Sequence, residues 1–120
     1  MSLESKRTWF EQLPKVELHL HLEGAIPYDA LWDLVQKYGG NIPDREVLKR
    51  RFGYKGFAHF IKIWVWKNKF LREYEDFMLI AEAVARNLVG QNIHYAEVFF
   101  SPADFVRHGL QTQRITEAIR

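Results

Sequence analysis

The sequence contains no cysteine, no long apolar run and no large excess of either charge. Without cysteine, the 120-residue chain forms neither a disulfide framework nor a thiolate metal site, so any bound metal must use nitrogen or oxygen ligands. The 17 lysines and arginines are nearly balanced by 15 acidic residues, which argues against a nucleic-acid partner. No segment approaches the roughly 20 apolar residues of a membrane span, and the first residues lack the apolar core of a signal peptide. We therefore expect a cytoplasmic protein that binds neither membranes nor nucleic acid.

The sequence does contain enough apolar material for one folded domain, because 48% of its residues are hydrophobic and 15% are aromatic. The spacing of these residues predicts two strands, at 16–22 and 93–100, and five helices, at 28–38, 44–52, 57–71, 75–88 and from 112 onward.

Two strands separated by helices predict a parallel pair in an α/β fold. Because two strands do not complete a parallel sheet, we expect residues 1–120 to be the N-terminal part of one (β/α)₈ TIM barrel domain. This part would carry strands 1 and 2, with an extra helical excursion between them.

The first predicted strand alternates apolar residues with Glu17, His19, His21 and Glu23. In a strand, alternate side chains point the same way, so these four residues are predicted to share one face, with the two histidines roughly 6–7 Å apart along it. Neutral imidazole is a common zinc ligand, and a catalytic zinc needs more than two protein ligands. The histidine pair therefore predicts part of a metal site at the end of a strand, where α/β barrels build their active sites.

Residues 13–26, which read LPKVELHLHLEGAI, closely resemble the opening strand of the adenosine deaminase family of metal-dependent amidohydrolases. Residues 95–102, which read YAEVFFSP, look like the second strand of the same family. The resemblance therefore spans nearly the whole chain, and it implies the barrel independently of the strand pattern.

The resemblance implies zinc-dependent hydrolytic deamination of an adenine-containing purine: adenosine, adenine or a modified adenine nucleoside. His19 and His21 would be two of the zinc ligands. No catalytic residue of the family falls within this chain, since the other ligands and the acid and base groups come from later strands. The 120 residues alone are therefore predicted to be inactive. The residues expected to bind the small-molecule substrate are Glu23, Phe57, Phe60, Ile61 and Trp64.

Two positions depart from the pattern of enzymes that act on adenosine itself. Glu23 stands where they usually have Asp, and Phe99 stands where they often have Arg. The resemblance therefore leaves the exact substrate open, and the oligomeric state is open as well.

Other interpretations use the same residues. The histidine pair could be the solvated face of an amphipathic strand, and the aromatic segment from Phe57 to Phe70 could be core packing. The chain could then be a non-catalytic helical binding or assembly module. A third interpretation keeps the barrel and the histidine pair but changes the reaction to hydrolysis of a cyclic amide or ester, since H-x-H strands serve those sites as well. Of the remaining histidines, His59 and His94 are expected to make local hydrogen bonds, and His108 is expected at the surface.

Overall fold

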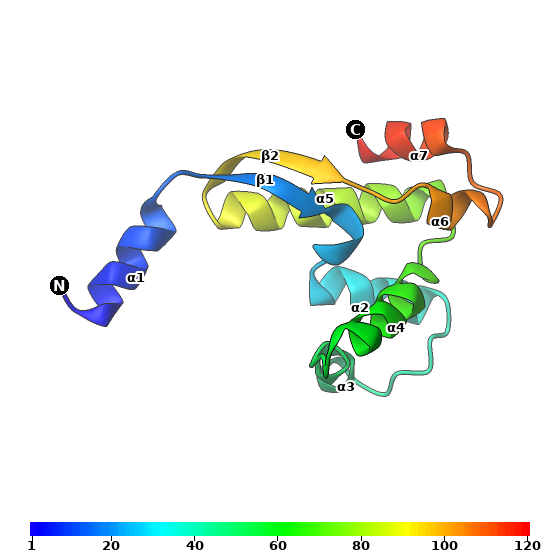
Figure 1. Ribbon diagram of the computed structural model, residues 1–120, viewed down its shortest axis with the longest axis horizontal. Helices are drawn as coiled ribbons and strands as arrows, with labels where there is room; N and C mark the ends of the chain where they lie inside the picture. The colour runs from blue at the N-terminus through cyan, green and yellow to red at the C-terminus, as the bar shows by residue number, and fades with distance from the viewer.

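The computed structural model describes residues 1–120 and consists of two strands and seven helices with a short 3₁₀ turn (Figure 1). In chain order the elements are α1 (Leu3–Gln12), β1 (Lys15–His21), the 3₁₀ turn η1 (Leu22–Gly24), α2 (Tyr28–Lys37), α3 (Arg45–Arg50), α4 (Phe57–Asn68), α5 (Tyr74–Gly90), β2 (Ile93–Phe99), α6 (Ala103–Val106) and α7 (Thr112–Ile119). None of the helices combines the length and apolarity needed to cross a membrane.

The two strands pair in parallel, which confirms the predicted α/β class. Helix α5 runs alongside the sheet, and α2, α3 and α4 gather beyond the carboxyl end of β1 (Figure 1). This end of β1 is therefore the place where the strand, the turn η1 and the intervening helices meet.

The face assigned to Glu17 from the alternation is wrong. Glu17 pairs with Ala96 and His21 pairs with Phe99, so β1 uses one more residue than β2 between these two positions. Since Ala96 and Phe99 are three residues apart on β2, they point to opposite faces, and so do Glu17 and His21. The Glu17 carboxylate instead accepts a hydrogen bond of 3.1 Å from the backbone N–H of His19.

The core lies among α2, α5 and the C-terminal helices. From α5, the fully buried side chains of Phe77 and Ile80 pack with buried residues of α2, and Phe77 meets Phe105 of α6 edge to face with ring centroids 4.8 Å apart. By contrast, Val16 and Leu18 of β1 are 61% and 58% exposed. These two side chains therefore stand largely outside the core, whereas Leu20 of the same strand packs against it.

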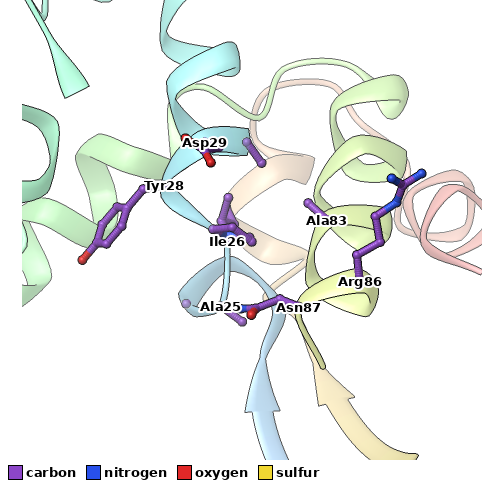
Figure 2. Close-up of a pocket in the computed structure, with 10 residues that line it drawn as sticks. Ala25, Ile26, Tyr28, Asp29, Ala83, Arg86 and Asn87 are labelled. Carbon is purple, nitrogen blue, oxygen red and sulfur yellow. The ribbon is translucent and has the colours of Figure 1, made fainter. Parts of the chain in front are cut away.

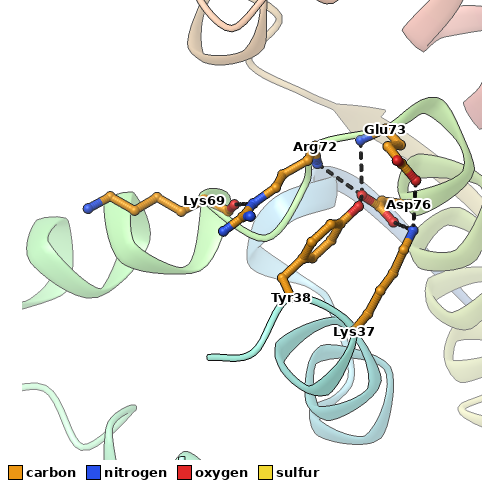
Figure 3. Close-up of polar contacts among 6 residues, drawn as sticks. All are labelled: Lys37, Tyr38, Lys69, Arg72, Glu73 and Asp76. Atoms are coloured by element: carbon orange, nitrogen blue, oxygen red, sulfur yellow. Dashed lines mark hydrogen bonds and ion pairs between the residues drawn. The ribbon is translucent and has the colours of Figure 1, made fainter. Parts of the chain in front are cut away.

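A buried carboxylate joins the end of α2 to the start of α5 (Figure 3). Asp76, only 2% exposed, accepts hydrogen bonds from Lys37 Nζ at 2.7 Å and from the Tyr38 hydroxyl at 2.5 Å. It also accepts from the backbone N–H groups of Arg72 and Glu73, at 2.9 and 3.0 Å. The bond from Glu73 caps the first turn of α5, because that N–H has no partner within the helix.

These contacts set the charge state of Asp76. Burial alone would raise the pKa of the carboxyl group, but the hydrogen bonds from Lys37, Tyr38 and the two backbone N–H groups outweigh burial and lower it. The pKa of Lys37 is raised first by its hydrogen bond to Asp76 and then by a second one, of 3.0 Å, to the carboxylate of Glu73. Lys37 and Asp76 therefore form a charged link between two helices that are far apart in sequence.

Several elements differ from the predicted pattern at their ends. Helix α1 was not predicted, and it contributes no buried residue and begins where the Ser2 side chain accepts a hydrogen bond from the N–H of Ser5. The four-residue helix α6 was not predicted either. Helix α4 ends at Asn68 rather than at Leu71, and α5 extends to Gly90. Gly39 does end α2 as predicted, with a positive φ of 64° that suits glycine.

Replacing Asp76 by Asn should lower the free energy of unfolding by about 2–4 kcal/mol at neutral pH, because it weakens a buried hydrogen-bonded charge. The folded-state pKa of Asp76 is lowered, so this stabilisation is present above about pH 4 and is lost as the pH falls through the folded-state value. Urea denaturation at several pH values measures both effects. Asp29→Asn is the control, since it breaks an exposed pair with Arg45 and should cost less than about 1 kcal/mol. Equal losses in the two variants would contradict the assignment.

Candidate metal and substrate site

The two predicted metal ligands converge at the carboxyl end of β1. The Nε2 atoms of His19 and His21 lie 3.2 Å apart, and the ring centroids lie 5.1 Å apart. Two imidazole nitrogens bound tetrahedrally to one zinc ion would be separated by about 3.3 Å, given Zn–N distances of about 2.0–2.1 Å. The rings therefore have the separation that a shared zinc ion requires, and they fit this group as two of its ligands.

The ring of His19 also stacks on Phe99 of β2, with centroids 4.6 Å apart and planes 29° apart. This contact follows from the parallel pairing, which places Phe99 opposite His21. Phe99 thus packs against the histidine pair, although the sequence indicated it only as a departure from a family pattern. The chain brings no group of three or more histidine, aspartate, glutamate or cysteine residues together, so it offers two metal ligands here and not a full set.

Glu23 lies in η1, the turn that directly follows His21, and is completely buried. Its Oε1 atom accepts a hydrogen bond of 2.6 Å from the backbone N–H of Ser101, which follows β2. Its Oε2 atom is buried and has no hydrogen-bond partner. A buried carboxylate oxygen without a partner is costly, so Glu23 retains an acceptor that a polar ligand can satisfy.

Helix α4 supplies aromatic side chains beside the histidines. The Trp64 ring meets the ring of His21 edge to face at 6.1 Å, and Phe60 lies 5.9 Å from Trp64. Gly24 lets the helix approach, because a Cβ there would lie 3.2 Å from Cζ3 of Trp64. The structure therefore places Trp64 against the histidine pair and Phe60 behind it.

The other two residues predicted to line the pocket lie further out. Phe57 stacks on Phe60 with centroids 6.1 Å apart, but it is 76% exposed. Ile61 is 40% exposed. Their part in substrate binding stays a prediction.

Lys67 is a residue of this region that the sequence reasoning missed. It is 5% exposed, it donates a hydrogen bond to the backbone carbonyl of Glu23, and its Nζ lies 4.3 Å from the centroid of Trp64. Burial lowers its pKa to about 8, although the nearby charge of Glu23 acts in the opposite direction. Lys67 follows Trp64 by three residues, so helical spacing places both on one face of α4. This spacing was the signal in the sequence that could have assigned Lys67 to the site.

The remaining histidines behave as predicted. His59 Nδ1 accepts a hydrogen bond of 3.0 Å from the N–H of Lys55, and His94 Nε2 lies 2.6 Å from Oδ1 of Asn92. His108 is exposed.

A hollow of about 860 Å³ is a separate feature (Figure 2). It lies between the β1–α2 connection and α5, and its lining includes Tyr28, Asp29, Arg86 and Asn87 but no histidine. The pair of imidazoles, and not this hollow, therefore defines the candidate site.

A parallel α/β arrangement with two imidazoles at the carboxyl end of a strand is typical of metal-dependent hydrolases built on barrels. The family model described as adenosine deaminase matches residues 14–120. The chain therefore belongs to the adenosine deaminase family.

Curated relatives include the adenine deaminase of Bordetella avium, which is 31% identical over 114 residues that cover 93% of this chain and 36% of the relative. The aminodeoxyfutalosine deaminase of Streptomyces avermitilis is 34% identical over 109 residues that cover 89% of this chain and 30% of the relative. The chain thus spans about a third of the length of these curated relatives.

Among solved structures, an amidohydrolase from Burkholderia ambifaria with bound zinc is similar to this chain, with a TM-score of 0.83 and 27% identity. The match covers 99% of this chain and 33% of the amidohydrolase chain. The N6-methyl-AMP deaminase of Arabidopsis thaliana superposes on this chain with a TM-score of 0.74 and 24% identity. The match covers 93% of this chain and 33% of the deaminase chain. At 24% identity, the similarity to the N6-methyl-AMP deaminase shows a shared fold and nothing more.

The buried position of Lys67 predicts how stability changes with pH. The pKa of Lys67 is about 8 in the folded protein, compared with 10.5 for an unperturbed lysine in the unfolded chain. Between these two pH values the unfolded chain therefore binds more protons than the folded protein. The free energy of unfolding contributed by this group should therefore rise with pH across that window. Urea denaturation of the protein and of Lys67→Met measures the difference, and Lys69→Met is the control because Lys69 is exposed. Identical pH slopes for the protein and Lys67→Met would refute the assignment.

Proposed function

We propose that the protein containing this chain catalyses zinc-dependent hydrolytic deamination of an adenine-containing purine. The observation that carries the proposal is the 3.2 Å separation of the His19 and His21 Nε2 atoms in a chain of the adenosine deaminase family. The names of the curated relatives add support, since adenine deaminase and aminodeoxyfutalosine deaminase both denote deaminases.

In this proposal His19 and His21 would hold zinc through their Nε2 atoms. When bound, zinc supplies a Lewis acid and an activated water for the hydrolysis. The stacking of His19 on Phe99 fixes the plane of that ring, and the hydrogen bond from its backbone N–H to Glu17 fixes the main chain beneath it. The remaining zinc ligands, and the groups that exchange protons with the purine, belong to parts of the protein outside these 120 residues.

The other predicted site residues bind the substrate. The free Oε2 of Glu23 accepts a hydrogen bond from a polar group of the purine compound. Trp64 and Phe60 form an aromatic wall on which a planar base can pack, and Phe57 extends this wall outward along α4. Ile61, on the same helix, is proposed to add apolar contact to the substrate. Such a wall excludes water from the reacting carbon and from the hydrogen bonds that orient the base.

Removing one imidazole tests the metal site. In the whole protein, His19→Ala should weaken zinc binding at least about a hundredfold, since even loss of a group that only supports a ligand weakens binding 10–100-fold. Competition with a chelator and measurement of bound zinc report the change, and deamination should fall with it. His108→Ala is the control, because His108 is exposed and far along the chain. Unchanged zinc affinity in His19→Ala would remove the basis of the proposal.

A substrate panel tests the reaction itself. The whole protein should release ammonia from at least one of adenine, adenosine and N6-modified adenine nucleosides or nucleotides, and it should leave lactones intact. Hydrolysis of a lactone with no deamination of any purine would favour the cyclic ester alternative instead. A polypeptide restricted to the 120 residues should deaminate none of these compounds, because it carries only two of the metal ligands.

A further inference from the structure

Lys67 is the one lysine of α4 that is withdrawn from solvent. Its side chain is 5% exposed, whereas Lys62 on the same helix and Lys69 at its end are exposed. A buried ammonium group loses its hydration, and a single hydrogen bond only partly replaces it. Helix packing alone does not call for a charge here, so the position of this lysine needs another reason.

The contacts of Lys67 lead to both sides of the candidate site. Its ammonium group donates to the carbonyl oxygen of Glu23, in the turn directly after His21. The same group lies over the face of Trp64, whose ring meets His21. An ammonium ion over an indole face is attracted to it, so one side chain holds the turn and the aromatic ring together.

The turn η1 is also fixed to the segment that follows the second strand. The carboxylate of Glu23 accepts a hydrogen bond from the backbone N–H of Ser101, which follows β2. The backbone carbonyl of Glu23 accepts a hydrogen bond from the Lys67 ammonium group. The backbone and the side chain of one residue are therefore held by two different elements. Only its Oε2 atom is left without a partner.

We propose that Lys67 is a positioning residue for substrate binding, which locks α4 onto η1 and so fixes Trp64 and the buried Glu23 carboxylate next to the strand end that carries the metal-binding imidazoles. This inference rests on the proposed function. Lys67 touches neither the metal ligands nor the free Oε2, so it acts through Glu23 and Trp64.

The test compares three variants of the whole protein. Lys67→Met keeps a similar side-chain volume but removes the donors and the charge. Lys67→Arg keeps donors and charge, and Lys69→Met removes an exposed lysine nearby. Lys67→Met should raise KM for the purine substrate about tenfold while kcat changes much less, as expected when ground-state binding is lost. Lys67→Arg should restore most of the binding, and Lys69→Met should behave like the parent protein.

A second measurement does not depend on turnover. Hydrogen exchange should become about tenfold faster at the backbone N–H groups of residues 22–25 in Lys67→Met, because the turn loses its tie to α4. Bound zinc should remain stoichiometric in all three variants.

The outcomes separate the two proposals. Unchanged KM and unchanged exchange in Lys67→Met would overturn the positioning role, and so would a loss of zinc or of folded protein that accounts for the whole effect. If the parent protein deaminates no purine, the proposed function fails. The exchange measurement then still decides whether Lys67 fixes the turn.

Discussion

The parallel pairing of β1 with β2 is the constraint on which the site depends. It brings the carboxyl ends of both strands to one edge, so that Phe99 lies against His19 and the N–H of Ser101 reaches Glu23. A parallel pair requires a crossover connection, and here that connection contains α2, α3, α4 and α5. The same connection that permits the pairing therefore also delivers the aromatic helix beside the histidines.

The Asp76 carboxylate gives this crossover a defined shape. It ties the end of α2 to the start of α5, and α4 lies between these two points along the chain. Lys67 makes a second tie, from the end of α4 to the turn after β1. Two buried charged groups, one of each sign, therefore hold the helices around the strand ends, while apolar packing of α5 supplies the core beneath them.

The sequence predicted the features that depend on local patterns. Alternation located β1, and helical spacing located α2, α4 and α5. The H-x-H pair indicated a shared metal, and the structure places the two rings at a compatible distance. The extra residue in β1 could not be predicted, because alternation assumes regular pairing, and so Glu17 was assigned to the wrong face. Lys67 was missed because lysine is rarely buried, and its reason lies in a partner 44 residues away.

The sheet has only two members, and Val16 and Leu18 on β1 are exposed. Each strand therefore keeps one row of main-chain donors and acceptors with no neighbour, flanked by aliphatic side chains. Such rows act as templates for β-strands of other molecules. A preparation of these 120 residues by themselves would accordingly tend to form intermolecular β-sheets through its unpaired strand edges. Because the net charge is small, charge repulsion between molecules would oppose this association only weakly.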